Sequence, residues 1–164
     1  MSSNFDAILA EYGPLLSRVA SSYEANPALR EELTQDIALA VWQSLARFAG
    51  SSSVKTYILK VAHNRAVSHV AKHAKAPALE NIDQHDFPHR AEGCMADLYD
   101  QDRKRQYLLD AVRTLPLQSR QVLTLSLEGV SYDDIAQICG LTRTHVGVLL
   151  NRAKTAIQRS LEHV

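Results

Sequence analysis

The sequence predicts an all-α protein made of two small helical domains joined by a flexible linker. Glycine and proline are scarce, with six and five copies in 164 residues. Apolar residues recur at three- and four-residue spacing in both halves, and no strand-like alternating run stands out. Residues 76–103 lack a sustained period and contain Pro77, Pro88 and Gly93. We therefore expect domains at residues 1–75 and 104–164, with residues 76–103 as the linker.

Three helices are expected in the first domain. One presents an apolar face from Phe5 to Val19, and Asn26-Pro27 interrupts the pattern. A second carries an apolar stripe from Leu33 to Phe48, which ends at Gly50 and the serines around it. The third runs from about Ser53 to His73 and turns its apolar residues inward.

The second domain resumes the helical period. Apolar residues from Tyr107 to Leu115 line one helix, which Pro116 closes. Another helix runs from about Gln118 to Glu128. Two further helices follow in the stretch from Gly129 to Lys154 and complete the domain.

This last stretch has the pattern of a DNA-binding helix-turn-helix. Ser131 is a suitable N-cap for a helix that ends near Cys139, and Gly140 can adopt the left-handed conformation that stops a helix. Thr142 then caps a second, basic helix that reaches about Gln158. A short polar helix that leads into a basic one across a glycine turn favours DNA binding. An ordinary helical hairpin can show the same pattern.

The distribution of charge is more informative than its total, which is zero. Residues 76–102 hold seven acidic residues and one basic residue, between two mildly basic blocks. From Val54 to Lys75 there are five basic residues and no acidic one, which indicates either a nucleic-acid surface or a solvated cationic face. The preceding helix bears the acidic, polar patch of Glu31, Glu32, Gln35 and Asp36. We expect that patch either to bind a basic protein partner or to face water.

Composition argues against several other classes of protein. Charged residues interrupt the N-terminus too early for a signal peptide, and no apolar run approaches a membrane span, so we expect a cytoplasmic protein. Cys94 and Cys139 lie far apart and have no metal-site spacing. No complete ligand set accompanies the histidine pair His69 and His73, or the trio His85, His89 and Cys94. We expect neither a metal nor a cofactor.

Taken together, these features resemble bacterial sigma factors of the sigma-70 family, in the extracytoplasmic-function (ECF) group. Residues 32–73 are similar to the second conserved region of the family, with its motifs at the family's spacing: Gln35-Asp36, Arg47-Phe48-x-Gly50, Thr56-Tyr57 and His63-Asn64. Residues 109–161 resemble the fourth region. They share its leucine-proline, its arginine-x-valine-leucine and its glycine-x-serine-tyrosine-x-x-isoleucine-alanine patterns.

The resemblance implies a non-enzymatic transcription initiation factor. It would bind core RNA polymerase, bring it to promoter DNA and help to melt the duplex, and an anti-sigma factor would be a further partner. The residues implied to bind the polymerase are Glu32, Gln35 and Asp36. Those implied to engage the minus-ten element are Lys55, Thr56, Tyr57, Lys60, His63 and Asn64. Those implied to read the minus-thirty-five element in the major groove are Arg143, Thr144, His145, Val148, Asn151 and Arg152.

The chain departs from the family on the second helix of its helix-turn-helix. Where the family commonly has lysine, serine and arginine, this sequence has Gly147, Val148 and Leu149. A glycine inside a helix is destabilising by about 1 kcal/mol relative to alanine. Val148 could contact a thymine methyl, so the promoter sequence does not transfer from relatives.

Other classes of function stay open on the residues alone. A stand-alone helix-turn-helix regulator would bind operators as a dimer, but no dedicated dimerisation helix is evident. An adaptor that binds only proteins fits poorly with the acid-free basic helix from Val54. An enzyme is the least supported class, because no catalytic constellation is found.

Overall fold

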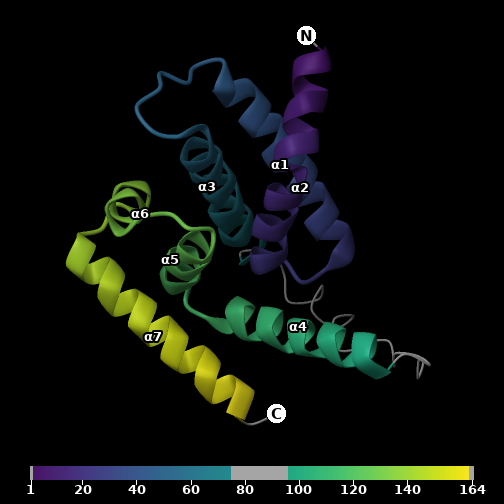
Figure 1. The fold of residues 1–164 in the computed structure, drawn as a ribbon, viewed down its shortest axis with the longest axis vertical. Coiled ribbons are helices and arrows are strands. Elements are labelled where there is room, and N and C mark those ends of the chain that lie inside the picture. The colour runs from purple at the N-terminus through teal and green to yellow at the C-terminus, as the bar shows by residue number, and fades with distance from the viewer. Residues whose placement is uncertain (1, 75–95, 163–164) are drawn as a thin grey trace.

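The computed structural model describes residues 2–74 and 96–162 of the 164-residue chain, and within these ranges it contains α-helices and no strand (Figure 1). The all-α prediction is confirmed. The helices are α1 (Ser2–Tyr23), α2 (Pro27–Leu45), α3 (Val54–Ala74), α4 (Ala96–Thr114), α5 (Leu117–Leu127), α6 (Tyr132–Cys139) and α7 (Arg143–Glu162).

Helices α1, α2 and α3 pack against one another and form what we call the N-terminal group. Asn26 starts α2, because its side-chain oxygen accepts from the backbone amides of Ala28 and Leu29 at 2.9 and 3.1 Å. Pro27 occupies the first helical turn, where a missing amide hydrogen does no harm. The core of the group includes these fully buried apolar side chains: Leu16, Leu33, Ile37, Val41, Ile58 and Leu59.

Helices α4 to α7 form the C-terminal group. The long α7 contacts α4, α5 and α6, so it is the element around which the group assembles. Its core includes buried residues from three helices, namely Val122, Leu125, Ile135, Val146 and Leu150. Because α6 has eight residues, its place depends on this packing more than on its own helical propensity.

Helix α4 begins at Ala96, so residues 96–103, which the sequence analysis placed in the linker, are helical. One contact along the side of α4 involves residues at the boundary that the sequence analysis predicted. The Arg103 guanidinium lies one turn before Tyr107, donates to its hydroxyl at 3.1 Å and sits 5.6 Å from its ring centre. The rest of the predicted linker lies outside the described residues.

The two groups touch. Helix α1 contacts α4 and α5, and α3 lies beside α5 (Figure 1). The buried apolar residues of the two groups form one continuous cluster. None of the helices in the described residues combines the length and apolar character that crossing a bilayer requires.

Candidate nucleic-acid and protein interfaces

The outer face of α2 presents the residues predicted to bind a protein partner. Glu32, Gln35 and Asp36 are all exposed, while Leu33 and Ile37 on the opposite side are buried. Asp36 lies 3.9 Å from Arg65 of α3, and both side chains are 49% exposed. An ion pair this long and this exposed contributes little to the stability of the fold. The carboxylates therefore remain available to a basic partner.

Two exposed apolar side chains continue this face. Leu39 is 48% exposed and Trp42 is 37% exposed, and they follow Gln35 by four and seven residues, at helical spacing. The Trp42 ring packs edge-on against Phe5 of α1, with ring centres 5.6 Å apart. The face therefore offers a partner both negative charge and apolar area.

The start of α3 is held by its own polar residues. The Ser53 hydroxyl oxygen accepts from the backbone amide of Thr56 at 3.1 Å, which makes Ser53 the N-terminal cap. The Tyr57 hydroxyl donates to the Ser44 carbonyl at 2.9 Å, and the Tyr57 ring lies 5.0 Å from that of Phe48. These contacts fasten α3 to the end of α2 and fix the direction of its first turn.

The structure brings most of the predicted nucleic-acid residues of α3 to the surface. Lys55, Lys60 and Asn64 are exposed, and Thr56 and Tyr57 are half-buried. Lys60 and Asn64 are four residues apart, so they project from one side of the helix. Lys55 donates from its Nζ to the Glu128 carbonyl of the C-terminal group at 2.9 Å.

His63 was predicted to contact DNA, but the structure places its side chain in the core. Its side chain is fully buried, and its Nδ1 lies 2.7 Å from the hydroxyl of Tyr23, which is also buried. Burial lowers the pKa of the imidazole to about 3, so the ring is neutral at ordinary pH. A signal was available in the sequence, because His63 is four residues after the apolar Leu59 and three before Ala66, both of which are buried.

The helix-turn-helix has the local geometry that its residues predict. The Ser131 hydroxyl accepts from the amide of Asp134 at 3.2 Å, and Gly140 takes the left-handed conformation with φ of 69°. The Leu141 amide then donates to the Ala136 carbonyl at 2.9 Å, which satisfies the end of α6. The Thr142 hydroxyl caps α7 by accepting from the His145 amide at 3.1 Å.

Helix α7 leaves its predicted DNA-reading face in solvent. The exposed residues on it are Arg143, Thr144, His145, Val148, Asn151 and Arg152. Thr144, Val148 and Asn151 recur at helical spacing and form the centre of the face. Arg143 lies 3.6 Å from Asp133, but both side chains are at least 70% exposed and the pair is weak.

The three consecutive residues that differ from the family's usual pattern lie in three different environments. Leu149 is buried and belongs to the core, so it reads no DNA. Val148 is 39% exposed at the centre of the predicted face. At Gly147, a β-carbon would meet nothing nearer than Cε2 of Tyr132 at 3.8 Å, so the position has room for a methyl group.

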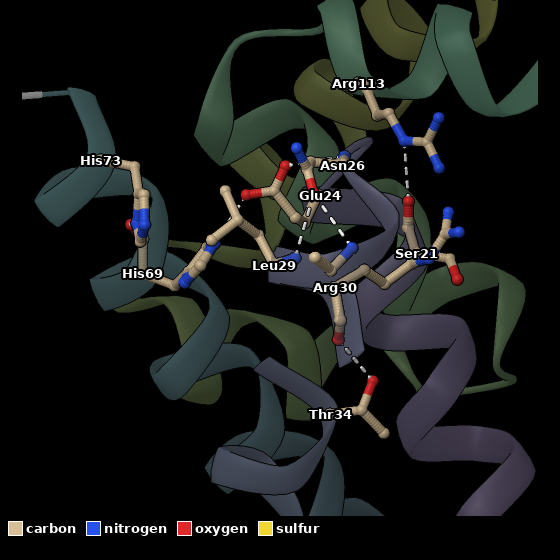
Figure 2. A network of polar contacts seen from close by, with 10 residues as sticks. Ser21, Glu24, Asn26, Leu29, Arg30, Thr34, His69, His73 and Arg113 are labelled. Carbon is tan, nitrogen blue, oxygen red and sulfur yellow. Dashed lines mark hydrogen bonds and ion pairs between the residues drawn. The ribbon is translucent and has the colours of Figure 1, made fainter. Parts of the chain in front are cut away.

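The histidine pair near the end of α3 is occupied by protein contacts (Figure 2). His69 Nε2 lies 2.8 Å from a carboxylate oxygen of Glu24, and His73 Nδ1 donates to the His69 carbonyl at 2.9 Å. The part of the chain that the structure describes holds no cluster of three metal-ligating side chains. His85, His89 and Cys94 lie outside it. Cys139 is partly buried against the core, and burial raises the pKa of its thiol to about 11.

Sequence reasoning missed the residues that join the two groups. Arg18 of α1 meets Glu128, which follows α5, with a distance of 2.9 Å from Nε to Oε1. Arg120 of α5 lies over the ring of Tyr23, 5.6 Å from its centre. These partners are about a hundred residues apart in sequence, and no local pattern links them.

Comparisons with known proteins assign both groups to one family. Residues 8–76 match the family model for Sigma-70 region 2, and residues 105–157 match that for Sigma-70, region 4. The chain is 27% identical over 141 residues to RNA polymerase sigma factor YlaC of Bacillus subtilis, covering 80% of this chain and 76% of that one. It is 23% identical to the ECF RNA polymerase sigma-E factor of Haemophilus influenzae, over 96% of this chain and 87% of that one.

A solved structure supports the same arrangement of helices. The sigma factor RpoE of Bartonella quintana, in complex with the anti-sigma factor NepR, superposes with a TM-score of 0.71 over 97% of each chain. The sequence identity is 24%, so this likeness is one of fold.

Proposed function

Because the chain belongs to the sigma-70 family of RNA polymerase sigma factors, in its extracytoplasmic-function group, we propose that it directs core RNA polymerase to promoters and assists their melting. In this role it acts in the cytoplasm, by binding alone and without covalent chemistry. One structural observation supports the proposal above others. A capped helix-turn-helix holds α7 with its polar face in solvent, on the group that matches region 4.

The C-terminal group reads the minus-thirty-five element. An α-helix fits the major groove, and the first turns of α7 carry the side chains that reach base edges. Arg143 and Arg152 contact phosphates or guanine edges, whereas Thr144 and Asn151 form hydrogen bonds. Val148 supplies apolar contact with a thymine methyl, which gives this chain a promoter preference different from that of relatives with a lysine-serine-arginine run.

The N-terminal group engages the minus-ten element. Lys55 and Lys60 neutralise phosphates, and Thr56, Tyr57 and Asn64 contact the bases of the melted strand. Capture of an unstacked base stabilises the open duplex, so binding itself promotes melting. His63 positions α3 from inside the core and does not touch DNA.

The acidic face of α2 docks on the polymerase. Glu32, Gln35 and Asp36 meet a basic surface, and the exposed Leu39 and Trp42 add apolar area beside them. An anti-sigma factor is a further partner in this proposal, because the solved relative from Bartonella quintana binds one.

A binding assay with purified core polymerase tests the proposal. We expect the wild-type protein to bind, and Glu32→Lys with Asp36→Lys to weaken binding by tenfold or more, on the order of the effect of reversing charges at an interface. The matched control is Asp100→Lys with Asp102→Lys on α4, which reverses two exposed acids away from α2 and should bind normally. Failure of the wild-type protein to bind core polymerase would overturn the proposal.

A second assay separates promoter reading from docking. Arg143→Ala with Arg152→Ala should weaken binding to promoter DNA, with a shallower salt dependence, and leave polymerase binding intact. Arg105→Ala with Lys154→Ala removes two exposed cations from another face of the same group and serves as the control. Equal effects from both pairs would place the reading face elsewhere.

A further inference from the structure

A cavity of about 800 Å³ lies between α1 and the C-terminal group, and the proposed function makes no use of it. Its volume falls in the range of pockets that hold small molecules, about 300–1,000 Å³. The residues that line it come from α1, α3, α4, α5 and α7, so segments distant in the sequence create it together. The chemistry of its walls decides what kind of molecule it can hold.

Apolar side chains make up much of the wall. They include Leu108, Leu123, Leu127, Ile157 and Leu161. Of these, Leu108 is 43% exposed, Leu127 71% and Leu161 44%, so large apolar side chains meet solvent where the cavity opens. Exposed apolar side chains that gather in one place mark binding sites. A hydrocarbon chain that covered these leucines would be stabilised by the burial of apolar surface.

The same wall carries two cations without an acidic partner. Arg105 of α4 and Lys154 of α7 both line the cavity and are exposed, and their two helices contact each other. Among the described residues, neither takes part in an ion pair. Glu128, the acidic residue of the described wall, already accepts two bonds from Arg18 at 2.9 and 3.1 Å. The opening therefore has an excess of positive charge, which suits a carboxylate.

A polar atom without a partner belongs to the inner part of the wall. His63 is fully buried and yet lines the cavity. Its Nδ1 lies 2.7 Å from the Tyr23 hydroxyl, whereas its Nε2 is buried and has no hydrogen-bond partner within the described ranges. An unpaired buried nitrogen is destabilising. A hydroxyl group on a bound molecule could pair with it, because a hydroxyl both donates and accepts.

These three features fit one class of ligand. We propose that the cavity binds a hydroxylated fatty acid. The carboxylate meets Arg105 and Lys154, the hydrocarbon chain covers the exposed leucines, and the hydroxyl group pairs with His63. A fatty alcohol lacks the charge and a short carboxylate lacks the chain, so we expect both to bind more weakly. The inference goes beyond the proposed function and does not rest on it.

Isothermal titration calorimetry on the full chain tests the inference. The probes are dodecanoate, dodecanol and a positional series of hydroxydodecanoates, each at concentrations at which it stays monomeric. We expect dodecanoate to bind, and dodecanol to bind about tenfold or more weakly, because the bonds to a charged group are lost. At least one hydroxydodecanoate should bind about fivefold more tightly than dodecanoate, which is the effect of one hydrogen bond.

A pair of variants locates the site. Arg105→Ala with Lys154→Ala should weaken the binding of dodecanoate by about tenfold or more. Lys104→Ala with Arg159→Ala is the matched control, because it removes two exposed cations from the same two helices outside the cavity wall. The control should bind dodecanoate as the wild-type protein does. The promoter assays above contain no fatty acid, so the first variant keeps its place as a control there.

Several results would overturn the inference. No binding of dodecanoate, or equal affinity for dodecanoate and dodecanol, would show that the cavity is not a fatty-acid site. Equal affinities of the two variants would place the carboxylate elsewhere. If dodecanoate binds as tightly as every hydroxydodecanoate, the hydroxylated class is wrong. None of these results bears on polymerase binding, so the proposed function stands or fails separately.

Discussion

The burial of His63 predicts that acid destabilises this protein in a definite pH window. The imidazole has an ordinary pKa of 6.5, and burial lowers its pKa to about 3 in the folded chain. Below pH 6.5 the His63 imidazole is protonated in the unfolded chain but stays neutral in the folded chain. Proton binding therefore favours the unfolded state. The contribution to stability is complete above about pH 6.5 and is lost as the pH falls toward about 3.

The magnitude follows from this difference in pKa. Each pH unit inside the window changes the free energy of unfolding by about 1.4 kcal/mol, so between pH 7 and pH 5 the loss is about 2 kcal/mol. Urea denaturation at the two pH values measures it. His63→Gln removes the titrating ring. Its loss of unfolding free energy between the same two pH values should therefore be about 2 kcal/mol smaller than that of the wild-type protein.

A matched control distinguishes burial from the mere presence of a histidine. His145 is exposed on α7, and His145→Gln should keep the pH dependence of the wild-type protein. If His63→Gln and the wild-type protein lose the same stability between pH 7 and pH 5, then His63 is not the buried neutral group described here.

Three further substitutions test the local structure by thermal and urea denaturation. Gly147→Ala should raise the free energy of unfolding by about 1 kcal/mol and Tm by about 2–4 °C, because its methyl group fits beside Tyr132 at 3.8 Å; a loss of stability would show a clash. Ser131→Ala should lower the free energy of unfolding by about 1 kcal/mol, since the cap on the Asp134 amide disappears, and an unchanged value would mean that the cap contributes nothing. Tyr57→Phe should lower the free energy of unfolding by about 1 kcal/mol, because the hydrogen bond to the Ser44 carbonyl is lost. An unchanged value would mean that solvent replaces that contact fully.

Local chemistry made much of the fold predictable. Ser131, Gly140 and Thr142 act through neighbours within a few residues, so the ends of α6 and α7 follow from the sequence itself. The exposed face of α7 follows in the same way, because the spacing of Val146, Leu149 and Leu150 defines the buried side.

Tertiary contacts explain what the sequence analysis missed. His63 is polar and lies on a basic helix, so composition favours an exposed side chain; Tyr23, forty residues earlier, gives it a buried partner instead. The contact between the two groups at Glu128 involves Arg18, which is 110 residues away. No local periodicity or motif connects the two members of either pair, because each contact forms only when helices that are distant in the sequence pack together.

Reconstituted transcription tests the central claim most directly. Purified protein and core RNA polymerase are combined on a library of promoter sequences, and the transcripts are sequenced. We predict start sites that depend on the added protein, downstream of a shared pair of upstream elements. Arg143→Ala with Arg152→Ala should reduce transcription from these promoters, whereas Arg105→Ala with Lys154→Ala should not. Core polymerase that gives the same transcripts with and without the protein would contradict the account.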